Sequence, residues 1–245
     1  MLHAILNGKA RRVSLLNDES HSWRSVFKRY EDLLTAAFWG RMSYLSHEAQ
    51  HKILSSLLAL DSRVWGTLDT IQFWPRYALP DEFDESLYAQ ITGEENFAEP
   101  DVVLTFKFAI IIIEVKPPAG GMQYQKQWFR EIYAWKNTDE NANGKKLHFL
   151  ALGNLPENYE ILSKQLENHF GDVKCHCIEW DQVRMVLQHP EWEWPTKADK
   201  RISEDCLQAL ALYGIREPLG PWKPFLNFLS SQNLPEDFSF LQGKQ

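Results

Sequence analysis

Three polar residues stand at the ends of two apolar segments, and their types suit chemistry on a phosphate. Asp101 opens the segment DVVLTF, and Glu114 and Lys116 close the segment AIIIIEVK. Carboxylate oxygens are the ligands that a hard divalent cation such as Mg²⁺ prefers, and such a cation can clamp a phosphate and lower the pKa of a bound water. A lysine beside them can orient that water or stabilise developing negative charge. These residues predict a metal-dependent hydrolytic site.

The three side chains meet only if the two segments pair as a hairpin. Both segments are rich in β-branched and aromatic residues, and only residues 107–108 separate them. In such a pair the start of the first strand lies beside the end of the second, which places Asp101 near Glu114 and Lys116. Strand side chains alternate, so Glu114 and Lys116 share a face while Val115 points into the opposite layer. The apolar character of the second segment predicts a strand that is buried on both faces.

Pro100-Asp101 followed thirteen residues later by Glu114-Val115-Lys116 resembles the signature of the PD-(D/E)XK, or restriction-endonuclease-like, nuclease superfamily. The resemblance implies hydrolysis of phosphodiester bonds, with DNA as the expected substrate and Mg²⁺ or Mn²⁺ as the cofactor. It also implies that Asp101, Glu114 and the carbonyl of Val115 bind the metal and that Lys116 is catalytic. Phage defence and DNA processing are the settings that it suggests.

Members of this superfamily often carry an acidic residue on the first helix, where it completes the metal site. A helix is predicted for residues 23–45, and at about 100° per residue Glu31 falls on its apolar arc with Phe27 and Leu34. A carboxylate on an inward face is costly unless something satisfies it. Glu31 is therefore a candidate metal ligand and catalytic residue, and an ordinary ion pair on the helix surface is the alternative.

Members also often carry a glutamine on the helix after the ExK strand. Three glutamines lie there, Gln123, Gln125 and Gln127. Gln127, beside Trp128, is the preferred candidate for the site. Glu131 stands four residues after Gln127, so the chain departs from the QxxxY variant of the superfamily. A solvated helix face is the alternative for these glutamines.

The other segments predict an α/β fold with a mixed central sheet flanked by helices. Helices are expected over residues 23–45, after Ser46 as N-cap, and over 122–135, 157–170, 181–188 with Asp181 as cap, and 203–213. Strands are expected over residues 68–79 with a break at Pro75, and over 101–106, 108–116, 146–152 and 173–179. The αβββαβ core belongs to a nuclease-like domain over residues 1–190. Residues 191–245 form a helical, aromatic C-terminal extension that packs on it.

The distribution of charge bears on partners more than the net charge of −7 does. Residues 1–30 carry six Lys or Arg against two acids, whereas residues 78–99 carry seven acids and no base. The candidates for phosphate contacts are the basic N-terminal segment, Lys107, Lys126, Arg130 and Lys136. The acidic segment also motivates an alternative, a non-catalytic nuclease-fold subunit that binds DNA or protein within a larger complex. A homodimer would suit cleavage of both strands of a duplex.

A competing motif is His47-Glu48-Ala49-Gln50-His51, which matches the HExxH pattern of zinc metalloproteases. Its polar Gln50 and its place at a predicted helix start favour an exposed helix end instead. Cys175 and Cys177 are expected in the core, and Trp192 and Trp194 are expected to pack a loop on the domain. The odd cysteine count and the absence of a signal peptide or membrane-span pattern predict a cytoplasmic protein.

Overall fold

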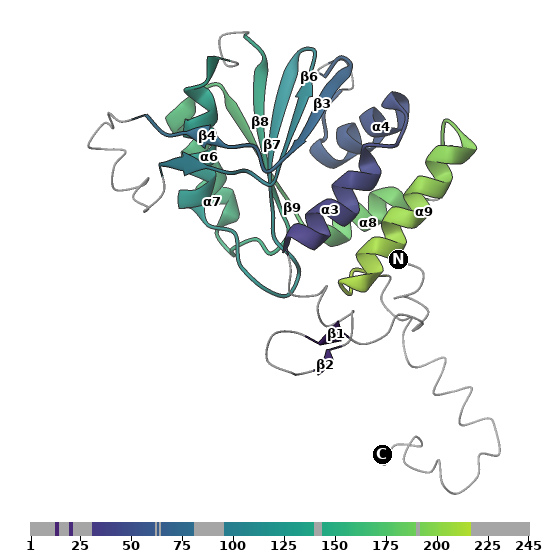
Figure 1. The fold of residues 1–245 in the computed structure, drawn as a ribbon. Helices are drawn as coiled ribbons and strands as arrows, with labels where there is room; N and C mark the ends of the chain where they lie inside the picture. Colours follow the sequence, from purple (N-terminus) through teal and green to yellow (C-terminus); the bar gives the residue numbers. More distant parts are fainter. Residues whose placement is uncertain are drawn as a thin grey trace, which may run out of the picture. The chain divides into compact units, whose positions relative to one another are not determined.

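A mixed five-stranded sheet forms the centre of the fold, as the sequence predicts. The computed structural model describes residues 31–216, apart from 62, 64, 81–95, 140–143 and 190–191. It also describes two short paired strands, β1 (Val13–Ser14) and β2 (Ser20–His21). The strand order in the large sheet is β3-β6-β7-β8-β9 (Figure 1). Its strands are β3 (Leu68–Phe73), β6 (Val102–Phe106), β7 (Ala109–Val115), β8 (Lys146–Leu152) and β9 (Val173–Ile178).

The expected hairpin is β6–β7, and it is confirmed. The two strands pair antiparallel, with Val102 opposite Ile113 and Thr105 opposite Ile110. Strand β3 pairs antiparallel with β6, while β7, β8 and β9 run parallel. Every residue of β7 is buried, because β7 is the central strand and helices cover both faces of the sheet.

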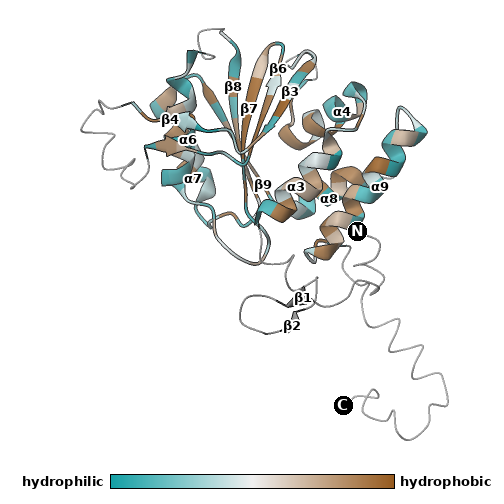
Figure 2. Cartoon of the chain, in the orientation of Figure 1, coloured by the Kyte–Doolittle hydropathy of each residue, from teal (hydrophilic) through white to brown (hydrophobic). Residues whose placement is uncertain are grey.

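Two helical layers cover the sheet. One contains α3 (Glu31–Met42), α4 (His47–Leu58), α8 (Trp180–Leu187) and α9 (Lys197–Leu212), and the other contains α6 (Gln125–Lys136) and α7 (Tyr159–Phe170). Side chains along β7 point alternately into the two layers. Ile111, Ile113 and Val115 pack with the first, and Ile110 and Ile112 pack with the second. Figure 2 shows hydrophobic colour concentrated on the sheet strands and hydrophilic colour on α7.

The helix ends follow local hydrogen bonding, and one expected cap is wrong. Ser46 caps α4 as predicted, with its hydroxyl accepting from the N–H of Ala49 at 3.3 Å. Helix α8 is capped by Glu179 in a capping box with Gln182, not by Asp181. Glu179 prevails because its carboxylate also accepts from the N–H groups of Asn154 and Leu155 after β8.

Several helices differ from their expected ranges. Helix α9 starts at Lys197, earlier than residue 203, because Thr196 accepts from the N–H of Asp199 and provides a cap. Helix α6 starts three residues later than expected, because the N–H of Gln123 donates instead to the carbonyl of Asn154. Helix α3 ends at Met42 rather than residue 45, and residues 23–30, with Phe27, lie outside the described residues.

The expected break at Pro75 is present. Strand β3 ends at Phe73, and the chain continues into β4 (Tyr77–Ala78), which pairs with β5 (Phe97–Ala98) in a separate two-stranded sheet. Most of the acidic segment connects β4 to β5 and lies outside the described residues.

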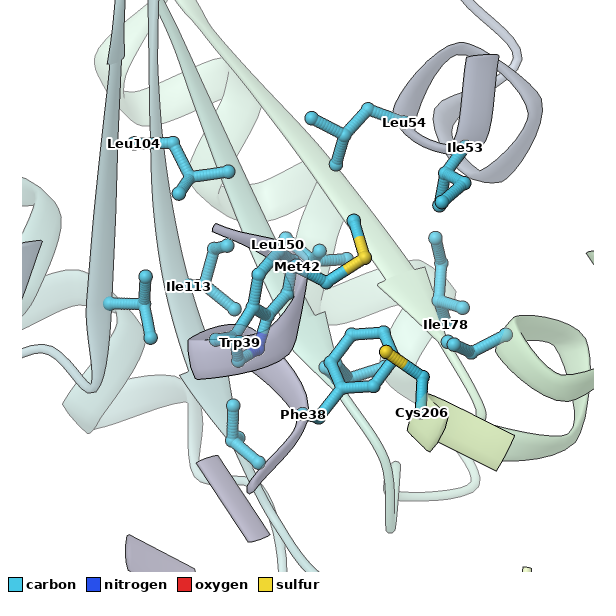
Figure 3. Packing of buried hydrophobic residues seen from close by; sticks show 14 of the residues in the cluster. Phe38, Trp39, Met42, Ile53, Leu54, Leu104, Ile113, Leu150, Ile178 and Cys206 are labelled. Atoms are coloured by element: carbon cyan, nitrogen blue, oxygen red, sulfur yellow. The ribbon is translucent and has the colours of Figure 1, made fainter. Parts of the chain in front are cut away.

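Helix α9 packs on α3 in the core of the first helical layer. Figure 3 shows Cys206 of α9 beside Phe38 of α3, and Arg41 of α3 pairs with Asp205 of α9 at 2.5 Å. Helix α9 belongs to the same compact unit as the sheet, and this unit ends at Ile215. None of the described helices has the length and apolar character that a membrane span requires.

Phe38 is expected to carry much of this packing. It is fully buried and makes edge contacts with Trp39 at 5.2 Å and Trp180 at 5.3 Å between ring centroids. Phe38→Ala should lower the free energy of unfolding by about 3–5 kcal/mol, because it removes a large apolar side chain and leaves a cavity. Urea denaturation measures this. Tyr44→Ala, at a 78% exposed position, is the control and should change it by less than about 0.5 kcal/mol.

Candidate active site

Asp101 is buried at the start of β6, and two neighbouring segments hold its carboxylate. The backbone N–H of Val115 donates to Asp101 Oδ2 at 2.8 Å, and the indole Nε1 of Trp74 donates to Oδ1 at 3.3 Å. The predicted approach of Asp101 to the end of β7 is therefore present. Its side chain takes the place of a ladder acceptor where the pairing of β6 with β7 ends.

Pro100 leaves the carbonyl of Val115 without a ladder partner. Pairing of β6 with β7 ends at Val102 and Ile113, and the same register carried two residues further would put Pro100 opposite Val115. The N–H and the carbonyl of one strand residue point to the same side, and the N–H of Val115 points towards Asp101. A proline has no N–H to donate. The carbonyl of Val115 therefore faces the start of β6 as an acceptor that the ladder does not satisfy.

Lys116 connects the end of β7 to the first helix. Its ammonium donates to Glu31 Oε1 of α3 at 2.8 Å and makes a closer contact with Glu114 Oε1. Glu114 is 1% exposed and Lys116 is likewise buried. Glu31 lies in the first turn of α3, and its carboxylate meets this cluster through the ion pair with Lys116.

Two of the glutamines contact Glu114 in different ways. Gln127, the preferred candidate, donates from Nε2 to Glu114 Oε1 at 2.6 Å. Gln123 is buried and donates to the backbone carbonyl of Glu114 at 3.1 Å, while the indole of Trp128 donates to its Oε1. Gln125 bonds Gln165 of α7 instead and does not belong to the cluster. Gln123 therefore fixes the strand end, and Gln127 fixes the carboxylate.

Glu131 is a site residue that the sequence reasoning missed. It lies one helical turn after Gln127, is only 2% exposed, and hydrogen-bonds Glu114 and Gln127. Its Oε2 has no hydrogen-bond partner. The available signal was its place on the apolar face of α6, between Trp128 and Trp135 at helical spacing.

Burial and like charge raise the carboxylate pKa values across the cluster. Burial, followed by the charge of Glu114, raises the pKa of Asp101 to about 8. Burial also raises the pKa of Glu131 to about 8, and burial and the charge of Glu131 hold the pKa of Glu114 well above its usual value. Burial alone would lower the pKa of Lys116, but Glu114 and Glu31 outweigh it and the net shift is upward. One lysine cannot balance four ionised carboxylates, so the cluster favours bound protons or a cation.

These residues fit a hard divalent cation. Glu31, Asp101 and Glu114 each offer a carboxylate oxygen within 4.8 Å of the others, and they form the only such group of three among the described residues. The carbonyl of Val115 and the unpartnered Oε2 of Glu131 add oxygen acceptors beside them. An all-oxygen donor set with excess negative charge suits Mg²⁺ or Mn²⁺.

The basic residues expected to contact phosphate lie in different places relative to the carboxylate cluster. Lys107 lies in the turn at the opposite end of β7, about 20 Å along the strand from Glu114. Lys136 lies at the far end of α6 and pairs with Asp172 at 2.5 Å. Arg130 donates to the carbonyl of Phe97 in β5. Lys126 is exposed in the first turn of α6, beside Gln127, and the basic N-terminal segment lies outside the described residues.

The HExxH residues do not assemble a zinc site in the described part of the chain. His47 is exposed at the start of α4, whereas the ring of His51 packs against Phe106 of β6. Among the described residues no third ligand joins them to make a metal-binding group. The reading of this motif as a helix start is therefore supported.

Other sequence expectations concern packing. Cys175 and Cys177 pack against the second core layer as free thiols. On the opposite face of β9, His176 Nε2 lies 3.1 Å from His148 Nδ1. Trp192 and Trp194 pack against the first core layer, as expected.

Comparisons with known proteins find few relatives. No family model matches the chain, and no solved structure matches it. One relative is an uncharacterized protein of Pasteurella multocida (strain Pm70), which is 27% identical over 235 residues that span 91% of this chain and 83% of that protein. The name of this relative states no activity, so the residues of the cluster carry the functional inference.

The raised pKa values predict how pH affects folding without metal. Between about pH 7 and 8, Asp101 and Glu131 hold protons in the folded state that the unfolded state, with ordinary values of 3.8 and 4.5, has released. The free energy of unfolding should therefore fall as pH rises through this window. Buried His148, whose pKa is lowered to about 4, is neutral in the folded state there. It adds only a smaller opposing slope, because the unfolded imidazole, with its ordinary pKa value of 6.5, releases its remaining protons in this window.

Glu131→Gln should flatten this dependence and stabilise the metal-free protein at pH 8 by at least about 1 kcal/mol. Urea denaturation in a chelator measures both quantities. Glu160→Gln, at an exposed position of α7, should leave the slope unchanged. A wild-type stability that rises between pH 7 and 8, or a Glu131→Gln slope equal to that of the wild type, would contradict the prediction.

Proposed function

We propose that the protein is a metal-dependent nuclease that hydrolyses phosphodiester bonds in DNA. The convergence of Glu31, Asp101 and Glu114 within 4.8 Å, with Lys116 bonded to two of them, is the observation that carries the proposal. Buried carboxylates with strongly raised pKa values and a charged partner are characteristic of functional sites. The αβββαβ order and the PD…ExK residues, which resemble the restriction-endonuclease-like superfamily, support the same function.

Asp101, Glu114 and Glu31 would hold Mg²⁺ or Mn²⁺ together with the carbonyl of Val115. When bound, the ion neutralises charge on the scissile phosphate and lowers the pKa of a water. Gln127 keeps the Glu114 carboxylate oriented by donating to Oε1. Glu131 lies behind Glu114 and shares its hydrogen bonding with Gln127.

Lys116 acts as a donor and not as the base. Because Glu114 and Glu31 raise its pKa above the usual lysine value, its ammonium stays protonated at neutral pH. A protonated lysine beside the scissile phosphate can donate a hydrogen bond to the attacking water and stabilise negative charge as it develops. The fixed position of Lys116 between α3 and β7 prepares it for this role.

The proposed setting is phage defence or DNA processing in the cytoplasm. The superfamily resemblance carries the biological role, and the three free cysteines are consistent with a reducing compartment. DNA is the proposed partner, and an acidic chain with few cations near the cluster would bind it weakly at physiological salt.

Removing the charge of Lys116 should abolish most of the activity. Lys116→Gln keeps hydrogen-bond donors on a slightly shorter side chain but loses the ammonium, so the rate of DNA cleavage should fall by at least about 100-fold. Cleavage of plasmid and single-stranded DNA in Mg²⁺ or Mn²⁺, with a chelator control, measures this. Lys174→Ala is the matched control, because Lys174 is exposed and lies two strands away from Glu114.

A folded wild type that cleaves no DNA with any divalent ion, and equals Lys116→Gln in this, would contradict the proposal. That result would favour the alternative of a non-catalytic subunit that binds DNA or protein. Cleavage that a chelator leaves intact would contradict the metal dependence.

Glu31 should contribute directly to metal affinity. Glu31→Gln removes one of three carboxylates, and we expect Mn²⁺ binding, measured by calorimetry, to weaken about tenfold or more. Glu48→Gln, an exposed acid on α4, should bind as the wild type does. Equal affinity in Glu31→Gln would limit Glu31 to its ion pair with Lys116.

A further inference from the structure

Trp74 has an unusual backbone conformation directly beside the carboxylate cluster. It follows the last residue of β3 with φ +47°, in the left-handed region that bulky residues rarely adopt. Its backbone N–H donates to the carbonyl of Asp101 at 3.0 Å, and its indole Nε1 donates to Asp101 Oδ1. The indole is therefore one hydrogen bond away from a proposed metal ligand.

One side of the Trp74 ring packs against a neighbouring aromatic ring of the protein. It contacts Phe73 with ring centroids 5.6 Å apart and an interplanar angle of 45°. Phe73 in turn packs against the first core layer. Successive strand residues normally point to opposite faces, and the left-handed conformation lets these two rings meet. Trp74 is thus held by Phe73 and by Asp101, so little conformational freedom remains for a ligand to remove.

Trp74 is nevertheless 36% exposed, and it is the one tryptophan among the exposed large hydrophobic residues in the described part of the chain. A tryptophan that is braced and hydrogen-bonded but not covered offers an aromatic surface to a ligand. Of the described cations, Arg76 pairs with Glu99 and Arg130 donates to the carbonyl of Phe97, while Lys107 and Lys136 lie far along β7 and α6. The contact that Trp74 itself offers is an uncharged aromatic one.

We propose that Trp74 stacks on an unpaired base next to the scissile phosphate. This inference rests on the proposed nuclease function and narrows its substrate to single-stranded DNA or to a strand end with unpaired nucleotides. A base inside a duplex is already stacked on its neighbours and offers no face to an indole. An unpaired base does, and stacking on an aromatic side chain tolerates any base. Through its hydrogen bond to Asp101, Trp74 places that base beside the cluster.

Three variants separate stacking from the hydrogen bond. Trp74→Phe keeps an aromatic face and loses the N–H, whereas Trp74→Leu loses both. Tyr44→Leu is the control, because Tyr44 is a 78% exposed aromatic residue beyond the opposite end of α3, about 20 Å from Glu31. Fluorescence anisotropy with a labelled thymidine oligonucleotide, in Ca²⁺ to prevent cleavage, measures binding by each full-length protein.

We expect Trp74→Leu to bind the single strand at least about fivefold more weakly than the wild type. Trp74→Phe should stay within about twofold of the wild type in binding, and Tyr44→Leu should match it. A 2-aminopurine placed beside the cleavage position should be quenched by the wild type and by Trp74→Phe, and not by Trp74→Leu. A change that only disturbed Asp101 would lower cleavage equally in Trp74→Phe and Trp74→Leu without this difference in quenching.

The failures of the two proposals are distinguishable. A wild type that cleaves single-stranded DNA, with Trp74→Leu binding and quenching equally well, overturns the role of Trp74 and leaves the nuclease function. A wild type that cleaves only duplex DNA without unpaired ends also overturns it and leaves the nuclease function. A wild type that neither binds nor cleaves any DNA overturns both.

Discussion

Uncompensated negative charge around Glu114 is the constraint on which the site depends. Glu114 lies at the end of a strand that is buried on both faces, where water cannot solvate a carboxylate. Lys116, Gln127 and Glu131 all contact it, yet only Lys116 brings positive charge. A cluster of this kind is stable only if it takes up protons or a cation. The need for protons or a cation therefore links the buried strand end to the proposed metal-dependent chemistry.

The ends of the strand ladders determine where the oxygen atoms point. Pairing of β6 with β7 stops at Val102 and Ile113, and just beyond it the Asp101 side chain replaces a backbone acceptor for the N–H of Val115. On the other side of β7, Gln123 satisfies the carbonyl of Glu114. The first interruption leaves the carbonyl of Val115 free to accept a ligand, and the second provides a side-chain donor for the carbonyl of Glu114. The site is therefore built from the places where regular pairing is interrupted, within a rigid sheet.

Elements from distant parts of the chain complete the cluster. Helix α3 brings Glu31 from one layer, while α6 brings Gln127 and Glu131 from the other. Trp74 directly follows the edge strand β3 and donates a hydrogen bond to the Asp101 carboxylate. The packing of both helical layers on β7 therefore does more than stabilise the fold. It aligns side chains that no single element could bring together.

The sequence by itself determined the hairpin, the burial of its second strand and the shared face of Glu114 and Lys116, because strand alternation is a local property. The mixed sheet followed from the order of the predicted elements, and helical periodicity placed Glu31 on the apolar arc while leaving a surface ion pair open. Only the tertiary structure decided that Glu131 joins Glu114, that Trp74 binds Asp101, and that Lys107 lies far from the cluster. Helix limits and the Glu179 cap also depended on hydrogen bonds to distant segments. Such contacts depend on how separate elements pack, and one-dimensional spacing does not specify this.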